Sequence, residues 1–248
     1  MSKIKSEKDI EILRKAGKLL AQVLQELKER VKPGIKTEEL DRYAHDRIRE
    51  LGGEPAFLNY RGFPGSICIS LNNEIVHGIP GPRVLEDGDI ISLDFGVEYK
   101  ELFVDAAITV PVGEIDPKIA HLMEITKDSL KKGIQQVRDG KTVGDIGAAV
   151  EECAKPHRYG VVRVLTGHGV GHAIHEPPII PNFGTPGEGE KLEAGMVIAI
   201  EPMFTLGTHE VELQPDKWTY ATADGSIAAH YEHTVLVKKG GSEILTIL

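Results

Sequence analysis

Apolar residues along this chain follow two different periods. In four stretches they recur three or four positions apart, which is the spacing of one face of a helix. These stretches are residues 7–31, 37–51, 117–139 and 142–156. Ser6 resembles the start of a capping box, Pro33-Gly34 and Gly140 end two of the stretches, and Asp116-Pro117 opens another. The pattern therefore predicts four helices.

Shorter apolar runs bounded by Gly, Pro or polar residues predict strands. They are residues 67–70, 90–94, 103–110, 161–165, 197–201, 204–213, 217–223, 227–237 and 244–247. The Pro- and Gly-rich segments 54–65 and 179–187 predict loops, and residues 167–172 predict a glycine-rich turn. Helices and strands occur in both halves of the chain, so we expect an α+β fold.

One strand pattern occurs twice. Residues 85–94 and 192–201 both read Leu-Glu-x-Gly, then an apolar run, then a carboxylate. Two further pairs of motifs occur in the same order in both halves. His77-x-x-Pro and His175-x-x-Pro precede the repeated strand, and Asp105 and Glu232 follow it. We therefore predict a single domain over residues 1–248, built of two pseudo-symmetric halves.

The repeated strands each carry an acid: Asp94, Asp105, Glu201 and Glu232. Any one of them alone is more often a surface residue or half of an ion pair. Four carboxylates brought together would repel and take up protons, unless cations compensate their charge. Two divalent cations supply four positive charges, and carboxylates bridge such pairs in hydrolases. An oxygen-rich site with one or two imidazoles favours Mn, Fe(II) or Co, and Zn remains an alternative.

The histidines divide into three groups. His168 stands between two glycines, so it is either a metal ligand or a phosphate contact, although the segment fits neither common phosphate-loop motif. His77 and His175 occupy matched positions in the two halves, which favours a function. His172, His209 and His233 are assigned to the surface or to supporting roles by default. Cys68 is expected to be a small buried residue, and Tyr60 and Phe63 lie in a loop that suits a pocket wall.

Composition excludes several classes of protein. A net charge of −9 argues against general nucleic-acid binding, although a local patch such as Lys131-Lys132 remains. Cys68 and Cys153 are the two cysteines, which indicates neither a disulfide framework nor a zinc knuckle and favours a cytoplasmic location. Residues 1–9 are too charged for a secretory signal, and no apolar run reaches the ~18 residues of a membrane span.

Taken together, several motifs resemble the methionine aminopeptidases over nearly the whole chain. The motifs lie at residues 66–70, 77–80, 88–94, 105, 167–171, 175–178, 200–203 and 231–234. The resemblance implies the pita-bread fold, with a curved antiparallel sheet, and the short bacterial type I form. It implies removal of the N-terminal methionine when the second residue is small. The alternatives are a prolidase or Xaa-Pro aminopeptidase and, from another class, a non-catalytic pita-bread binding module.

The resemblance also implies residue roles. Asp94 would chelate one ion, Asp105 and Glu232 would bridge both, and His168 and Glu201 would complete the second. Glu201 would shuttle a proton, His175 would stabilise the oxyanion and His77 would contact the scissile amide. The methionine pocket would be formed by Tyr60, Phe63, Cys68, Ile174 and Trp218, with Ile174 replacing the aromatic residue that several family members carry. The implied partners are the N-termini of nascent chains and, transiently, the ribosome, with the enzyme a cytoplasmic monomer.

Overall fold

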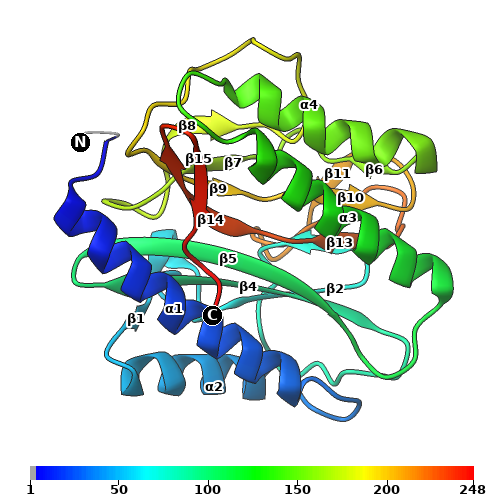
Figure 1. Ribbon diagram of the computed structural model, residues 1–248. Helices are drawn as coiled ribbons and strands as arrows, with labels where there is room; N and C mark the ends of the chain where they lie inside the picture. The colour runs from blue at the N-terminus through cyan, green and yellow to red at the C-terminus, as the bar shows by residue number, and fades with distance from the viewer. Residues whose placement is uncertain (1–3) are drawn as a thin grey trace.

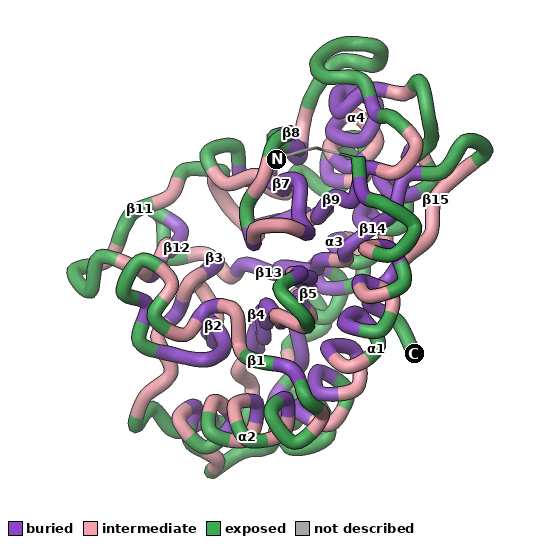
Figure 2. Tube along the Cα trace, turned by 90° about the vertical axis from the view of Figure 1, so that its left-hand side faces the viewer, coloured by how far each residue is buried: buried purple, intermediate pink, exposed green. Residues whose placement is uncertain are grey.

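Antiparallel strands form the centre of the molecule and four α-helices cover one side of them. The computed structural model describes residues 4–248, so the first part of the charged segment 1–9 lies outside the described residues. In Figure 2, α1 and α3 lie on one side of the central strands, whereas β3, β11 and β12 lie on the other. The helices are α1 (Glu7–Arg30), α2 (Thr37–Glu50), α3 (Pro117–Gln136) and α4 (Val143–Ala154), with short 3-10 turns η1 (Tyr60–Gly62) and η2 (Lys155–His157).

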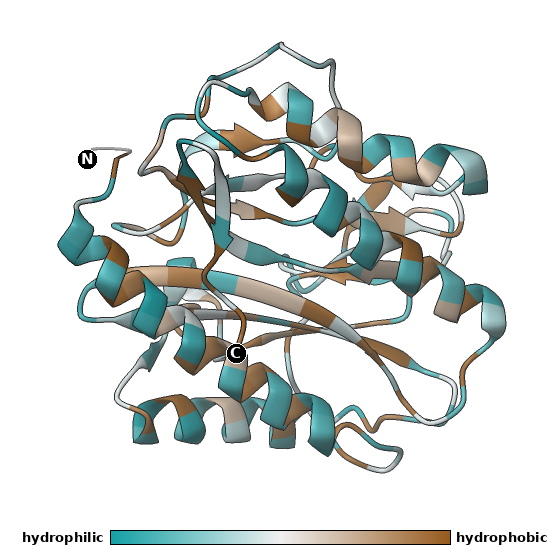
Figure 3. Cartoon of the chain, in the orientation of Figure 1, coloured by the Kyte–Doolittle hydropathy of each residue, from teal (hydrophilic) through white to brown (hydrophobic). Residues whose placement is uncertain are grey.

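The helices form where the spacing predicts them. The Ser6 hydroxyl accepts a hydrogen bond from the Asp9 amide, and the Asp9 side chain bonds back to Ser6, which completes a capping box. Helix α1 buries a stripe of leucines against β4 and β5 and exposes its polar face, as the colouring in Figure 3 shows. Helix α3 ends at Gln136, short of Gly140, because the amide of Asp139 bonds to Lys238 and that of Gly140 to Leu192.

The first half is organised on a long hairpin. Its strands are β4 (Ile90–Tyr99) and β5 (Leu102–Pro111), which pair along their whole length (Figure 1). Strand β2 (Cys68–Leu71) pairs with the other edge of β4, and β1 (Glu54–Pro55) pairs with its end. Helices α1 and α2 pack on this sheet in one continuous apolar core.

The second half has the corresponding strand order. Strand β9 (Val197–Ile200) lies between β7 (Gly167–Gly169) and β14 (His233–Lys238), as β4 lies between β2 and β5. Strands β8 (Glu176–Ile180) and β15 (Gly241–Ile244) extend this sheet at its two edges. Helices α3 and α4 pack on it in a second apolar core.

The remaining short strands build one end of the molecule. Two three-stranded sheets have the orders β13-β10-β6 and β11-β12-β3. Their members are β3 (Glu74–Val76), β6 (Gly160–Val161), β10 (Met203–Thr205), β11 (Val211–Leu213), β12 (Tyr220–Thr222) and β13 (Ala228–His230). Within residues 4–248, no helix combines the length and the apolar content needed to cross a membrane.

The expected turn at residues 167–172 is wrong in its first half, where residues 167–169 form strand β7. A Cβ on Gly167 would overlap the carbonyl of Ala199, and one on Gly169 would overlap that of Pro177. These glycines therefore allow strands to approach closely rather than turn the chain. The first two residues of the expected loop at 179–187 belong instead to strand β8, which pairs with β7.

Other boundaries also differ from the expectation. The expected strand 227–237 is two strands, β13 and β14, separated by Tyr231 and Glu232. The break arises because β13 pairs with β10 whereas β14 pairs with β9, so the chain changes sheets there. The expected strand 161–165 is reduced to Gly160–Val161, and the last strand shifts from 244–247 to Gly241–Ile244.

Candidate metal centre

Strand pairing places three of the four acids, Asp94, Asp105 and Glu232, on one face of the first sheet. Asp94 pairs with Ala107, and Asp105 lies two residues from Ala107 on the same strand, so both carboxylates point the same way. The amides and carbonyls of Ala107 and Glu232 exchange hydrogen bonds, which places Glu232 opposite Ala107 and on that face too. Asp94, Asp105 and Glu232 therefore converge from β4, from β5 and from the short segment between β13 and β14.

The second sheet adds an imidazole and a fourth acid. His168 on β7 pairs with Ala199 on β9, and Glu201 lies two residues after Ala199. His168 Nε2 lies 4.0 Å from Asp105 Oδ2 and 3.7 Å from Glu201 Oε1. Ligand atoms of Asp105, His168 and Glu232 all lie within 4.8 Å of one another.

The acids are buried without enough hydrogen-bond donors. Asp94 Oδ1, Asp105 Oδ1 and Glu232 Oε1 are buried and have no hydrogen-bond partner among the described residues. Burial raises the pKa of Asp94 to about 7. Burial, and then repulsion from the neighbouring carboxylates, raises the pKa values of Asp105, Glu201 and Glu232 well above normal. The protein alone thus leaves this cluster short of positive charge.

His168 is prepared to act as a neutral ligand. Its Nδ1 lies 2.9 Å from the Gly169 carbonyl, which can only accept, so Nδ1 carries the proton. The Nε2 lone pair then faces Asp105 and Glu201. Burial, together with the nearby His175, lowers the pKa of His168 to about 3, which keeps the ring neutral. Imidazoles that bind metals are commonly oriented by such a bond from the other ring nitrogen.

The donor set suits divalent cations. It offers the three buried carboxylates of Asp94, Asp105 and Glu232, the half-buried carboxylate of Glu201 and one imidazole nitrogen, and three of the carboxylate oxygens are unpaired. Hard oxygen-rich sites with an imidazole bind Mn, Fe(II), Co or Zn. Two such ions would balance the four negative charges, and the residues present therefore fit the two-metal site that the sequence predicts.

A cavity of about 360 Å³ opens beside the acids. Among the predicted wall residues, Tyr60, Phe63, Cys68 and Trp218 line it, and the Phe63 and Trp218 rings meet edge to face at 5.3 Å. Ile174 is buried outside this lining, and its Cδ1 lies 3.1 Å from where a Cβ on Gly96 would be. The wall is therefore aromatic and largely apolar, and it ends at the carboxylates.

The two matched histidines lie at this cavity. His175 Nδ1 lies 3.0 Å from the Tyr60 hydroxyl, and its ring centroid lies 4.4 Å from that of His168. His77 has a left-handed backbone with φ of 59°, which is strained for a residue other than glycine. Burial, and then the nearby His175, lowers the pKa of His77 to about 4. Both rings are therefore neutral hydrogen-bonding groups near neutral pH, since burial also lowers the pKa of His175.

Three further residues belong to the site and were missed in the sequence. Phe57 and Arg61 line the cavity from the loop that carries Tyr60. His230 is buried, and its Nε2 lies 3.7 Å from Glu201 Oε2. The spacing of His230 and Glu232 is the one available signal, because residues two apart on a strand share a face.

The described positions of the remaining histidines agree with supporting or surface roles. His172 Nε2 lies 3.6 Å from Asp9 on α1, and His233 Nδ1 lies 2.9 Å from the Thr246 hydroxyl. Neither ring lines the cavity beside the acids. His209 lies on the surface near the loop that follows η2.

Comparison with known proteins defines the class. The profile of metallopeptidase family M24 matches residues 11–239. The chain belongs to that family, whose members carry the antiparallel α+β arrangement described above.

Several relatives that cover nearly the whole chain are named methionine aminopeptidases. The protein of that name from Clostridium perfringens is 46% identical, over 99% of this chain and 98% of its own. Methionine aminopeptidase 1 of Bacillus subtilis is 45% identical, over 98% of each chain. The crystal structure of the Rickettsia prowazekii methionine aminopeptidase superposes with a TM-score of 0.97 at 42% identity and covers all of both chains. A prolidase from Pyrococcus furiosus is more distant, with a TM-score of 0.81 and 25% identity over 99% of this chain and 65% of its own.

Proposed function

We propose that the protein is a metal-dependent methionine aminopeptidase. It removes the N-terminal methionine from peptides and nascent chains whose second residue is small. The observation that carries this function is the buried cluster of Asp94, Asp105, His168, Glu201 and Glu232 at the end of an aromatic cavity. Relatives that share 42–46% of their residues over nearly the full length carry the same name.

We assign the metal ligands as follows. Asp94, Asp105, His168, Glu201 and Glu232 would hold two divalent cations, with Asp94 contributing to one, His168 and Glu201 to the other, and Asp105 and Glu232 to both. The unpaired oxygens of Asp94, Asp105 and Glu232 and the free Nε2 of His168 support this assignment. Divalent cations bound here would supply a water that deprotonates near neutral pH and would polarise the scissile carbonyl.

The side chains around the cluster then perform the proton transfers. Glu201 accepts the proton of the attacking water and passes it to the leaving amine, because its carboxylate lines the cavity beside His168. His175, neutral and held by Tyr60, donates a hydrogen bond to the oxygen that becomes negative. His77 lies on the other wall and positions the scissile amide.

The cavity accounts for the preference for methionine. Phe63, Trp218 and Tyr60 offer an apolar aromatic wall, and the thioether of methionine packs favourably against aromatic rings. Cys68 pairs with Asp94 across two strands, so the wall continues directly into the acids. A free α-amine beside the carboxylates would explain why cleavage is confined to the first peptide bond.

A peptide panel tests the proposal. With Mn, Co or Fe(II) supplied, the protein is expected to release methionine from a Met-Ala-Ser peptide. Removal of the metal by a chelator should abolish the release. Comparable cleavage of Xaa-Pro peptides would favour the prolidase alternative, and metal binding without any cleavage would favour a binding module. Metal analysis of the purified protein would identify the ions.

We further infer that the protein acts in the cytoplasm as a monomer and meets its substrates through transient contact with the ribosome. Analytical ultracentrifugation tests the monomer. Co-sedimentation with translating ribosomes, at two salt concentrations, tests the contact, which should weaken as salt increases.

A further inference from the structure

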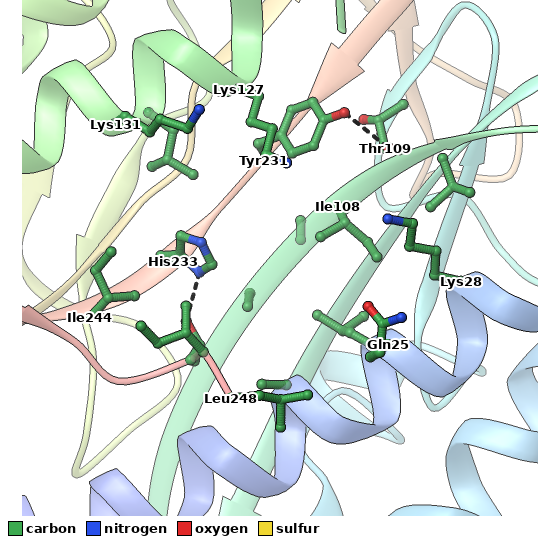
Figure 4. Close-up of a pocket in the computed structure, with 18 of the residues that line it drawn as sticks. Gln25, Lys28, Ile108, Thr109, Lys127, Lys131, Tyr231, His233, Ile244 and Leu248 are labelled. Carbon is green, nitrogen blue, oxygen red and sulfur yellow. Dashed lines mark hydrogen bonds between the residues drawn. The ribbon is translucent and has the colours of Figure 1, made fainter. Parts of the chain in front are cut away.

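A second and larger cavity lies behind the metal centre. It occupies about 590 Å³ between α1, α3 and strand β5, with Ile247 and Leu248 at one end (Figure 4). We call it the α1–α3 groove. Tyr231 and His233 line it, and both flank Glu232 in the sequence. Since neighbouring residues of an extended chain point to opposite faces, the groove is the reverse side of the segment that carries this carboxylate.

Three lysines surround the groove, and none of its lining residues is Asp or Glu. Lys28 reaches it from α1, and Lys127 and Lys131 reach it from α3 (Figure 4). Lys131 pairs with Asp128 at 2.8 Å, whereas Lys28 and Lys127 form no ion pair or hydrogen bond within residues 4–248. The carboxylate of Leu248 pairs with none of the three in the same range. In a chain of net charge −9, this is a local concentration of unpaired positive charge.

His233 adds a hydrogen-bond donor on the floor of the groove. Its Nδ1 lies 2.9 Å from the Thr246 hydroxyl, as the dashed line in Figure 4 shows. The Thr246 hydroxyl accepts the Thr234 amide at 3.2 Å, and Nδ1 of His233 is the acceptor that the described residues offer to the hydroxyl proton, so the hydroxyl donates to Nδ1. The ring proton therefore sits on Nε2. That nitrogen has no partner among the described residues, although the ring is largely enclosed by the protein.

The floor of the groove favours an aliphatic chain over a peptide. It is formed by apolar side chains of α1, α3 and β5, including Leu24, Ile108, Met123 and Ile134. Strand β5 is fully paired with β4 on one edge, and on the other it bonds to Glu232 and Thr234. A peptide lying along β5 would find no free strand edge there and would leave its backbone groups unpaired along that strand. An acyl chain carries no such groups.

We propose that the α1–α3 groove binds a linear aliphatic monocarboxylate. The acyl chain lies along the apolar floor, and the carboxylate is held by Lys28, Lys127 and His233 Nε2. The volume of about 590 Å³ is within the range of about 300–1,000 Å³ in which proteins bind small organic ligands. The site is separate from the aromatic cavity beside the metal ligands, because the two share no lining residue.

Calorimetry of the metal-loaded, full-length protein tests the proposal with octanoate, decanoate and dodecanoate below their micelle concentrations. Each buried methylene should tighten binding about three- to fourfold. Dodecanol, which lacks the charge, should bind more weakly than dodecanoate. The double variant K28Q/K127Q should weaken dodecanoate binding about five- to tenfold, the amount two exposed charge pairs provide. The matched control Lys132→Gln, on an exposed neighbour outside the groove, should leave affinity unchanged.

Competition locates the bound carboxylate. Dodecanoate affinity should be unaffected when the aromatic cavity is filled by a non-hydrolysable methionine analogue. Loss of binding under that condition would place the ligand at the metal centre and overturn the proposal. Equal binding by inorganic phosphate, or by an acidic peptide, would reduce the groove to a general anion or peptide surface and would also overturn it. Neither outcome depends on whether the protein cleaves methionine peptides.

Discussion

A buried ion pair fixes the loop that carries His175. Lys5 Nζ lies 2.6 Å from Glu176 Oε2, and both side chains are buried, at 1% and 9% exposure. The other oxygen of Glu176 accepts hydrogen bonds from the amides of His172 and Ala173. The segment before α1 is therefore bonded to residues 172–176, which hold both His175 and Ile174 in place. The substitution Lys5→Met removes the charge and keeps a chain of similar shape.

The expected cost of Lys5→Met follows from the geometry. Removing one partner of a buried pair costs about 3–5 kcal/mol, because the other charge stays buried and unpaired. Glu176 keeps two backbone donors, which reduces the deficit, so we expect a loss near the lower end, at about 3 kcal/mol. The loop should also become less well positioned. Since a displacement of about 1 Å can cost a hundredfold in rate, kcat should fall roughly ten- to a hundredfold.

Urea denaturation and steady-state kinetics with saturating metal measure the two effects. Lys8→Met is the matched control, because Lys8 is an exposed lysine on the first turn of α1. Adding Glu176→Gln to Lys5→Met should recover part of the lost stability, since the unpaired charge is then removed. A variant as stable as the parent protein would refute the account of the pair. A large loss of stability with unchanged kcat would refute its role in positioning His175.

Three other predictions follow from the metal centre and the cavity. Glu201→Gln should lower kcat at least a hundredfold with the fold retained by circular dichroism, and near-normal turnover would exclude Glu201 as the proton carrier. The metal-free protein should lose stability as pH rises from about 5 to 8, which thermal unfolding measures. The stability decreases because the pKa of Asp94 is about 7 in the folded protein, above its value in the unfolded chain. The proton on Asp94 therefore stabilises the fold, and this contribution disappears as the pH passes 7. Added Mn should reverse this trend, and a metal-free stability that increases with pH would contradict it. Gly96→Ala should lower the free energy of unfolding by about 1–3 kcal/mol and raise KM for methionine peptides. The reason is that the new Cβ would lie 2.7 Å from Phe57 Cε1 and 3.1 Å from Ile174 Cδ1. An unchanged KM would show that this wall does not shape the pocket.

The elements that the sequence predicts well are those with local causes. Helices α1, α2 and α4 start where Ser6, Thr37 and Thr142 predict, because apolar period and capping residues are local signals. The strands around Asp94 and Asp105 were also predicted, since short apolar runs after a glycine turn determine them. The family and its fold are confirmed by the match over residues 11–239.

The elements that were missed have non-local causes. Strand β7 forms because Gly167 and Gly169 let three strands approach, and a glycine run by itself is equally compatible with a turn. The break at Tyr231 and Glu232 depends on which sheet each side joins. His230 lies beside Glu201 because two sheets meet there, and its spacing of two residues from Glu232 is the one local signal of that position.

The two halves of the scaffold explain why the site is asymmetric. Ser70 pairs with Ser92 in the first sheet, and His168 pairs with Ala199 in the second, 107 positions after Ser92. In the first half the hydroxyl of Ser70 accepts the Gly78 amide, so that position supports the loop after His77. In the second half Ala199 is small, which leaves room beside it for an imidazole. The same strand pairing therefore places Ser70, which supports a loop, in the first half, and His168, which offers a nitrogen to a metal, at the corresponding position of the second half. Carboxylates from both halves meet that nitrogen, so the centre needs both copies of the scaffold and only one histidine.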